Sequence, residues 1–358
     1  YTMRQVTETE IKKRLAFDNP WWESSEVDLD PSQTQPRDYF GPFFRLVSES
    51  DVRRAVILMG PRRVGKTVMI HHAIRGLIEA AVPVTNILYL SLDTPIYNGA
   101  SLERLLGLFA ELHGHARDTE LYVFFDEIQY LKDWEVHLKS LVDSYRRIRF
   151  VGSGSAAAAL RLKSHESGAG RFTDFLLPPL TFAEYLRFAG LEEELIRPDE
   201  NPRYEVKDYE LLNDAFVDYV NFGGYPEAVF SDAIRRDPAR YIRGDIIDKV
   251  LLRDLPSLYG IGDIQELNSL FTTLAYNTAS EVSYEGLSQS SGVSKNTLRR
   301  YLTYLEAAFL VRRVHRVDQN ARRFKRATTF KVYLTNPSMR AALFGTAKIE
   351  DDAMASLA

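Results

Sequence analysis

Eight consecutive residues near the start of the chain have the types and the spacing needed to hold a nucleotide phosphate. They fit the pattern G-x-x-x-x-G-K-[ST], in which a wide loop turns its backbone N–H groups inward around the β-phosphate. Lys66 is placed to reach the β- and γ-phosphates, and Thr67 is placed to ligate Mg²⁺. An ordinary turn between a strand and a helix is the alternative. The residues predicted to bind the nucleotide are Gly60, Pro61, Arg62, Arg63, Val64, Gly65, Lys66, Thr67 and Val68.

A second group of chemically useful residues follows an apolar run further along the chain. Residues 122–125 are apolar or aromatic, and Asp126 and Glu127 come directly after them. An apolar run that ends in acids is typical of a buried central strand that delivers carboxylates to the edge of a sheet. We predict that Asp126 holds Mg²⁺ through its water shell and that Glu127 is the general base toward the attacking water. The alternative is a pair of solvated acids at the end of a strand.

Two further residues are candidates for sensing or stabilising the γ-phosphate. In P-loop ATPases of the additional-strand type, the strand after the acidic strand lies between it and the phosphate-loop strand. A polar residue at the tip of that strand can sense the nucleotide, and Ser153 is the candidate. The alternative is that Ser153 belongs to an ordinary Ser/Gly turn. Arg171 follows a polar loop and is a candidate arginine finger. The alternative is that it is an ordinary surface arginine. The predicted catalytic set is Lys66, Glu127, Ser153 and Arg171.

The elements that must position these residues alternate between apolar strands and amphipathic helices, which is typical of a parallel α/β sheet. Strands are expected at residues 55–59, 86–92, 121–125, 149–152 and 171–176. Helices are expected near residues 66–81, 101–113 and 134–146. We therefore predict an α/β fold, a P-loop NTPase core of the additional-strand type with a parallel sheet.

After residue 178 the pattern becomes mostly helical. Thr181 with Glu184 indicates a capping box at the start of a helix, and residues 204–221 have helical spacing. Residues 222–226 interrupt that helix, and residues 227–258 resume the pattern with breaks at Pro238 and Pro256. This stretch is predicted to be a helical lid or linker.

Residues 283–302 have the form of a helix, a tight turn and a second helix. Ser294 is placed to cap the second helix, and residues 309–314 and 329–334 indicate two strands that enclose a basic loop. Together these predict a winged helix-turn-helix. The alternative to DNA binding is a winged helix that serves only as a protein-interaction or packing module. The side chains predicted to meet phosphates or base edges of duplex DNA are Lys295, Asn296, Arg299, Arg300, Arg322 and Arg323.

Charge is unevenly distributed along the chain. Residues 290–331 hold eleven Lys or Arg against Glu306 and Asp318, a local charge of +9 in a chain whose net charge is −4. The rest of the chain therefore carries −13. Such asymmetry indicates an acidic body with a basic binding module. The predicted domains are an N-terminal extension at 1–50, the P-loop core at 51–190, the helical lid at 191–266, the winged helix-turn-helix at 267–335 and a tail at 336–358.

Bulk composition excludes several classes of protein. The sequence has no cysteine, which excludes disulfides and thiolate metal sites and favours a cytoplasmic location. No segment approaches the roughly 18 consecutive apolar residues of a membrane span, so no membrane partner is expected. The seven histidines show no spacing of a metal site. The sequence leaves open a homo-oligomer in which a neighbouring subunit supplies an activating arginine.

The order of these motifs resembles the prokaryotic AAA-like ATPases, relatives of the archaeal-type and signal-transduction ATPases whose C-terminal half is known only as a domain of unknown function. The resemblance spans roughly residues 52–334 and implies ATP binding by an α/β core followed by a winged helix. Members commonly continue into a nuclease-like segment, and no such signature is found through Ala358, so no nuclease role is predicted. The residues that carry the resemblance are 60–67, 125–129, Trp134, Gly152-Ser153, Gly170-Arg171, 179–185, Gly223-Gly224-Tyr225-Pro226 and 293–310.

The leading hypothesis from the sequence is an ATP-hydrolysing switch that uses Mg²⁺ and couples its nucleotide state to duplex DNA or to a partner. The alternative is a nucleotide-gated scaffold, or a regulator of transcription or signalling, with little turnover. A kinase of small substrates is disfavoured because no residues resemble a dedicated acceptor pocket.

Overall fold

The structure is a computed structural model that describes residues 6–30, 33–49, 52–155, 170–198, 204–237, 239–315, 328–349 and 351–357. The chain divides into two compact units. The first, which we call the sheet unit, comprises Tyr1–Gly60 and Gly65–Leu177. The second, the helical unit, comprises Pro61–Val64 and Pro178–Ala358. The helical unit thus includes the middle four residues of the glycine-rich loop.

A five-stranded parallel sheet forms the centre of the sheet unit, with the order β2-β3-β4-β1-β5. Strand β4, which follows β3 in the chain, lies between β3 and β1. This is the order predicted for an additional-strand P-loop core, and each predicted strand is present to within two residues at either end. The strands are β1 (Ala55–Met59), β2 (Ile87–Ser91), β3 (Leu121–Asp126), β4 (Ile148–Gly154) and β5 (Phe172–Leu176).

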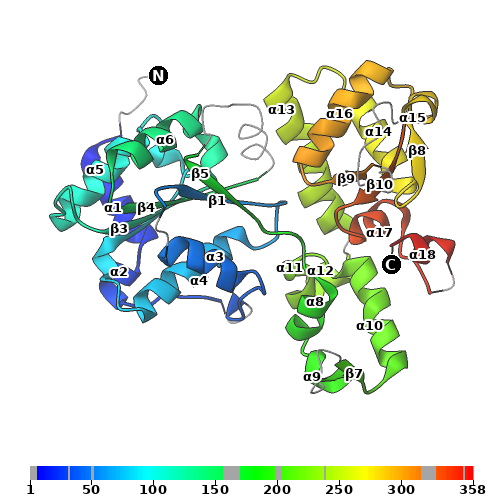
Figure 1. The fold of residues 1–358 in the computed structure, drawn as a ribbon, viewed down its shortest axis with the longest axis horizontal. Coiled ribbons are helices and arrows are strands. Elements are labelled where there is room, and N and C mark those ends of the chain that lie inside the picture. The colour runs from blue at the N-terminus through cyan, green and yellow to red at the C-terminus, as the bar shows by residue number, and fades with distance from the viewer. Residues whose placement is uncertain are drawn as a thin grey trace. The chain divides into compact units, whose positions relative to one another are not determined.

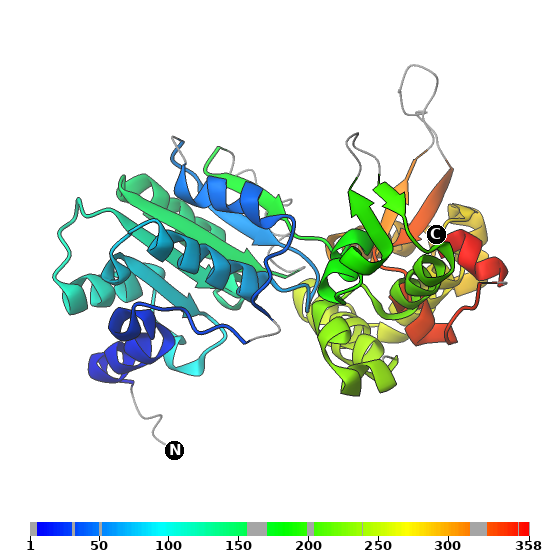
Figure 2. The ribbon, with the colours of Figure 1, turned by 90° about the horizontal axis from the view of Figure 1, so that it is seen from below.

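Helices cover both faces of this sheet (Figures 1 and 2). In the strand order of the sheet, the connection from β1 to β2 runs in one direction, and the connections from β2 to β3 and from β3 to β4 run in the opposite direction. Because these crossovers are right-handed, α4 lies on one face of the sheet, and α5 and α6 lie on the other. Every residue of β1 and β3 is buried because both faces are covered, which explains their continuous apolar runs. The helices and 3₁₀ turns are α3 (Phe40–Ser48), α4 (Lys66–Glu79), α5 (Leu102–His113), α6 (Trp134–Ser144), η2 (Val84–Asn86), η3 (Pro95–Tyr97) and η4 (Ile128–Tyr130).

The N-terminal extension covers the edge strand β2 with α1 (Glu8–Asp18) and α2 (Trp21–Ser24). The Asn19 side chain donates to the Tyr89 carbonyl at 2.7 Å and accepts from the Tyr89 N–H at 2.6 Å, as a neighbouring strand would. The indole N–H groups of Trp21 and Trp22 donate to the Ile87 carbonyl at 3.4 and 2.8 Å. These bonds satisfy backbone groups that an edge strand leaves unpaired.

The first part of the helical unit contains the predicted capping box, in which the Thr181 hydroxyl accepts from the Glu184 N–H and the Glu184 carboxylate accepts from the Thr181 N–H. Two details differ from the predictions. Residues 204–206 form a strand, and the helix expected from 204 begins at Tyr209, because the Asp208 side chain caps it there. The elements are α8 (Phe182–Phe188), α9 (Glu192–Leu195), β6 (Ile196–Pro198), β7 (Tyr204–Val206), α10 (Tyr209–Phe222), α11 (Pro226–Phe230) and α12 (Asp232–Arg236).

The second difference concerns Pro256. Two π-helical segments, η6 (Arg240–Asp248) and η7 (Val250–Asp254), run directly into α13 (Leu255–Tyr259), so the helical stretch does not break at Pro256. The missing N–H of proline falls where the backbone bonding changes from i+5 to i+4, a position that tolerates a lost donor. The break expected at Pro238 lies outside the described residues.

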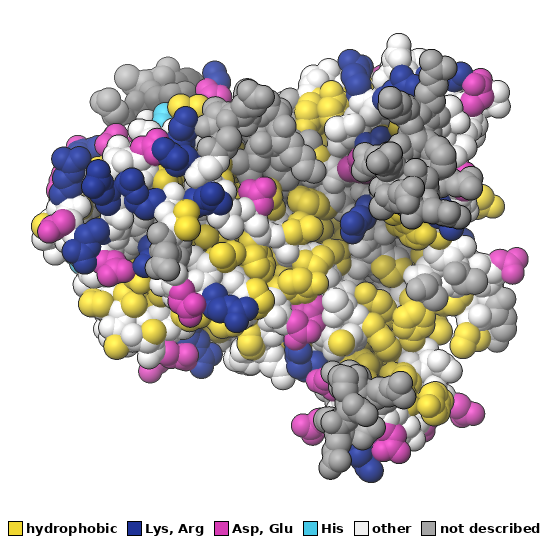
Figure 3. Space-filling view, viewed as in Figure 1, with side chains coloured by type: hydrophobic (Ala, Val, Ile, Leu, Met, Phe, Trp, Pro, Cys, Tyr) yellow, Lys and Arg dark blue, Asp and Glu magenta, His cyan; other side chains and the backbone are white. Residues whose placement is uncertain are grey.

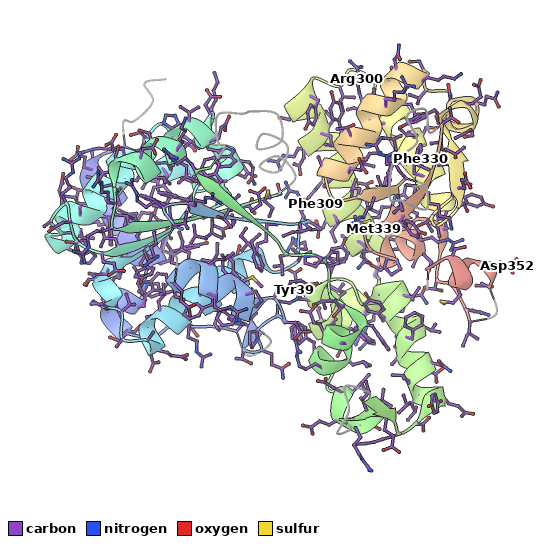
Figure 4. The ribbon with its side chains drawn as sticks, viewed as in Figure 1. Tyr39, Arg300, Phe309, Phe330, Met339 and Asp352 are labelled. Carbon is purple, nitrogen blue, oxygen red and sulfur yellow. The ribbon has the colours of Figure 1, made fainter. Side chains whose placement is uncertain are left out.

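The C-terminal part has the element order of a winged helix-turn-helix (Figure 1). Helices α15 and α16 are joined by a turn at Gly292, whose φ of 76° suits glycine, and the Ser294 hydroxyl caps α16. Strands β8, β10 and β9 form an antiparallel sheet in that order, and Phe330 of β10 is buried (Figure 4). The elements are α14 (Ile264–Tyr276), β8 (Glu281–Ser283), α15 (Tyr284–Ser291), α16 (Lys295–Ala307), β9 (Val311–Val314), β10 (Thr329–Leu334), α17 (Ser338–Phe344) and α18 (Asp352–Leu357).

Candidate nucleotide-binding site

The glycine-rich loop joins the end of β1 to the start of α4. Gly65 precedes the helix with a φ of 90°, a conformation that glycine adopts without strain. Helix α4 has 14 residues, and its first turn presents backbone N–H groups and the positive end of the helix dipole. The Lys66 ammonium is buried and donates to the Gly60 carbonyl at 3.1 Å. The loop therefore collects the positive charge and the backbone donors that a polyphosphate needs.

The Asp126 carboxylate is the centre of a buried hydrogen-bond network. Its Oδ2 accepts from the Thr67 hydroxyl at 2.7 Å and from the Tyr89 hydroxyl at 3.1 Å. Its Oδ1 accepts from the Ser153 hydroxyl and from the Glu127 N–H, the latter at 3.0 Å. Because β4 lies between β3 and β1, Ser153 falls beside both the loop strand and Asp126. The structure thus brings Thr67, Asp126 and Ser153 together.

The Thr67 and Asp126 oxygens fit a magnesium ion. A hydroxyl and a carboxylate are hard oxygen ligands, and Mg²⁺ is commonly held by one or two such groups together with substrate phosphates and water. The two side chains are already in contact at 2.7 Å beside the N-terminus of α4. Among the residues that the structure describes, no group of three His, Cys, Asp or Glu side chains is arranged to hold a metal.

Glu127 follows Asp126 at the end of β3 in a left-handed conformation, with a φ of 50°. The Gln129 side-chain N–H donates to the Glu127 carboxylate, and the Gln129 side-chain oxygen accepts from the Ser155 N–H at 3.4 Å. Strained backbone at such a position is common in catalytic sites. Sequence reasoning assigned no role to Gln129, although its place two residues after a candidate base was a usable signal.

Tyr89 is the second residue that sequence reasoning missed. It lies in the middle of an apolar strand, and only the pairing of β2 with β3 shows that its hydroxyl reaches Asp126. Burial and the neighbouring carboxylate raise the pKa of this hydroxyl, so it stays protonated and donates. His71 packs against Tyr89 with ring centroids 5.0 Å apart, and burial lowers the pKa of His71. His71 is therefore neutral near pH 7.

The two arginines in the middle of the loop are ion-paired within the helical unit. The Arg62 guanidinium donates to both oxygens of Asp254 at 2.8 and 2.9 Å. Arg63 donates to both oxygens of Glu227 at 2.9 and 3.2 Å, and Glu227 also accepts from the Tyr241 hydroxyl at 2.8 Å. The carboxylate partners lie far along the chain, so no local pattern could have predicted them.

Arg171 is not brought to this site, which corrects the prediction that it serves there as an arginine finger. The Ala55 N–H donates to the Arg171 carbonyl at 2.9 Å, which places Arg171 beside the beginning of β1. The loop follows the other end of β1, and the two strands run parallel. The Arg171 guanidinium instead pairs with Asp143 at 2.5 Å.

The side chains predicted to contact DNA lie on the surface of α16, and Lys295, Asn296, Arg299 and Arg300 are all exposed. Lys295 pairs with Glu285 at 2.5 Å, and the Arg299 guanidinium lies 5.2 Å from the centre of the Tyr284 ring. Figure 4 shows Arg300 on α16. The predicted Arg322 and Arg323 lie outside the described residues.

Comparison with known proteins agrees with this geometry. Residues 52–186 match the family model of the AAA domain. Residues 52–186 are therefore similar to an AAA domain. The glycine-rich loop, Asp126 and Ser153 all fall inside these matched residues. Residues 213–350 match a second family model, described as a domain of unknown function (DUF8612).

Three relatives share long stretches of sequence with this chain. An uncharacterized protein of Haemophilus influenzae is 23% identical over 306 residues, which cover 84% of this chain and 72% of the relative. Two uncharacterized proteins of Methanocaldococcus jannaschii, MJ1637 and MJ1544, are 26% and 24% identical over 75% and 71% of this chain. The chain spans only 58% and 55% of the length of these two relatives.

Two solved structures align along most of the chain but at low similarity. They are the Orc1 protein of Aeropyrum pernix in complex with DNA and Cdc6p of Pyrobaculum aerophilum. The TM-scores are 0.38 and 0.37, at 11% and 14% identity, with 94% and 95% of this chain and 98% of each structure covered. These TM-scores are too low to support an argument. Separately, none of the helices in the described part of the chain has the length and apolarity of a membrane span.

Proposed function

We propose that this protein is a Mg²⁺-dependent ATPase whose nucleotide state is coupled to its helical unit. The observation that carries the ATPase proposal is the Thr67–Asp126 hydrogen bond of 2.7 Å beside the loop, because it joins the two oxygens suited to the metal. Lys66 supplies positive charge for the β- and γ-phosphates. Mg²⁺, when bound, would neutralise phosphate charge from the side of Thr67 and Asp126.

Glu127 is the proposed general base. Its carboxylate takes a proton from the attacking water as the water oxygen bonds to the γ-phosphorus and the bond to the bridging oxygen breaks, which yields ADP and phosphate. Gln129 orients this carboxylate through its side-chain amide. Ser153 donates to Asp126 and lies next to the Glu127 N–H at 3.4 Å, so its hydroxyl links the two acids. We assign Ser153 the role of sensing the γ-phosphate because it lies on β4, between the strand that precedes the loop and the strand that carries Asp126.

Coupling is proposed to run through Arg62 and Arg63. These residues belong to the loop by sequence and to the helical unit by packing, where they pair with carboxylates of η6, η7 and α11. Asp254 is mostly buried, with 12% of its side chain exposed, so the bidentate pair with Arg62 is shielded from solvent. A change in the loop's conformation on phosphate binding therefore changes contacts of the helical unit.

The pair between Arg62 and Asp254 predicts the first measurable effect. Asp254→Asn is expected to weaken ATP binding about fivefold, since a loop without its partner must be ordered on binding at a cost of about 1 kcal/mol. Titration calorimetry with a non-hydrolysable ATP analogue measures the change, with Asp214→Asn on the exposed face of α10 as the control. Arg62→Ala and the Arg62→Ala/Asp254→Asn double variant should each lose as much affinity for the ATP analogue as Asp254→Asn does alone. Additive losses would show that Arg62 acts on phosphate independently of Asp254.

A second candidate function is a nucleotide-gated scaffold with little turnover. It is favoured by the bond between the Gln129 amide and the Glu127 carboxylate, because a carboxylate held by a neighbour is a less available base. The ATPase rate of the wild-type chain with Mg²⁺, measured with and without duplex DNA, decides between the two functions. Turnover in either condition supports the ATPase, and its absence in both supports the scaffold.

We also propose that the exposed face of α16 binds duplex DNA. Arg299→Ala and Arg300→Ala are each expected to weaken binding at low salt and to reduce the slope of log affinity against log salt by about 1, because each removes one phosphate contact. Fluorescence anisotropy at several salt concentrations measures both, with Lys348→Ala as an exposed control in the same unit. Adding Arg323→Ala should reduce the affinity further. If the wild-type chain does not bind DNA at low salt, α16 is a packing or protein-interaction surface.

A further inference from the structure

The sheet unit contains a cavity at the edge of the sheet where the strands begin. The glycine-rich loop follows the end of β1, so this cavity and the candidate nucleotide site lie at opposite edges of one sheet. Its volume is about 340 Å³, which falls in the range of small-molecule sites. The lining comes from the C-terminal half of α3, residues 52–56, Glu120, the end of α6 and the start of β4. We call it the amino-edge cavity.

Arginines dominate the charge of this cavity. Five of its lining residues are arginines, and Glu120 is the single acid among them. Arg149 lies 3.7 Å from Glu120. Within the described ranges, no carboxylate pairs with the other four. These arginines are Arg53, Arg54, Arg146, Arg147 and Arg149.

Across the segments that the structure describes, the lack of a carboxylate partner sets Arg53, Arg54, Arg146 and Arg147 apart from other arginines of the same unit. Arg14, Arg75 and Arg104 each pair with a carboxylate, at 3.0 Å or less in the first two cases. On the visible face of the sheet unit, Lys and Arg side chains gather toward the left of the view (Figure 3). Several guanidinium groups around one concavity create a positive potential that an anion neutralises. The sequence had shown only the pairs Arg53-Arg54 and Arg146-Arg147 and nothing that joined them.

The walls of the cavity suggest the shape of the anion. Leu46, Val52 and Ile148 line it beside Tyr145, so an apolar or aromatic body finds matching surface. Guanidinium groups bind carboxylate and phosphate alike through paired N–H donors, and several of them around one concavity favour the more highly charged phosphate. The concave shape and the limited volume favour a compact ligand.

We propose that the amino-edge cavity binds a small phosphorylated molecule, with its phosphates on Arg54 and Arg147 and its body against the apolar wall. The proposal is independent of ATP binding at the glycine-rich loop, because the two sites share no residue. It gives the sheet unit a second anion site and so a place where a metabolite can act on the ATPase core.

The test uses inorganic tripolyphosphate as the probe and the full chain carrying Lys66→Ala, which removes the main phosphate ligand of the loop. Titration calorimetry at low salt is expected to show one remaining binding site. Adding Arg54→Gln and Arg147→Gln should weaken this binding at least about tenfold, since each lost charge-assisted bond costs a large share of the affinity. Arg75→Gln, which removes the same charge from α4, should leave it unchanged.

Three outcomes would overturn the proposal. The first is that the Lys66→Ala chain does not bind tripolyphosphate, and the second is that it binds equally well with and without the two Arg→Gln changes. The third is that the two Arg→Gln changes weaken the binding of duplex DNA but not of tripolyphosphate, which would make this edge a nucleic-acid contact. Circular dichroism checks that the variants fold. If the double variant unfolds, Arg53→Gln and Arg146→Gln, both on exposed side chains, are tested singly and should each weaken binding.

Discussion

Lys66→Ala is expected to abolish measurable ATP binding. The Lys66 ammonium is buried at the start of α4 and donates to the Gly60 carbonyl of the glycine-rich loop at 3.1 Å. Its positive charge therefore lies beside the loop in a site shielded from water, where it attracts a phosphate more strongly than in bulk solvent. Removing one member of a buried charged pair costs about 2–5 kcal/mol, which corresponds to an affinity loss of at least about 30-fold. Calorimetry with a non-hydrolysable ATP analogue and Mg²⁺ measures this loss.

Lys13→Ala is the matched control, because Lys13 is exposed on α1 of the same unit and the change removes the same charge. It should bind ATP as the wild type does. Thermal unfolding of both variants without nucleotide separates binding from folding. Wild-type affinity in a folded Lys66→Ala chain would mean that the loop does not hold the polyphosphate.

Glu127→Gln is expected to retain ATP and to lose hydrolysis. The substitution keeps the size of the side chain and removes the proton acceptor, so the turnover number should fall by about 10²–10⁴ while the dissociation constant for ATP changes little. Phosphate release under single-turnover conditions measures the chemical step, and calorimetry measures binding. The exposed Glu23→Gln on α2 is the control.

This pair of measurements also distinguishes the two proposed functions. If the wild type turns over and Glu127→Gln does not, Glu127 is the base and the Gln129 contact serves to orient it. A Glu127→Gln chain that hydrolyses ATP at the wild-type rate would assign the base to another residue. Weakened ATP binding in Glu127→Gln would instead indicate a role in holding the nucleotide.

The core of the fold could be predicted from the sequence because its signals are local. Each strand of the sheet unit is a short apolar run, and each following helix has amphipathic spacing. The position of β4 between β3 and β1 followed from recognising the loop and the acidic strand together. The errors occurred where a local signal competes with tertiary context. Pro256 lies inside a helical stretch, and residues 204–206 pair with β6 although their spacing is helical.

The residues of the candidate site likewise fall into those that a local motif predicted and those that only the tertiary structure shows. Lys66, Thr67 and Asp126 were predicted from motifs, and the structure brings the last two into contact. Arg171 was a candidate because it follows a polar loop, and the register of β5 against β1 puts it at the other edge of the sheet. Tyr89 carried no motif and became visible only through strand pairing.

The sequence by itself determined the phosphate loop, the acids that follow β3 and the winged helix, because contiguous residues encode each of these. Only the tertiary structure decided which residues meet across the chain. Asp254 as the partner of Arg62 and the arginines of the amino-edge cavity come from segments far apart in sequence. Such contacts depend on strand order, register and helix packing, and the burial of apolar side chains across the whole unit fixes these.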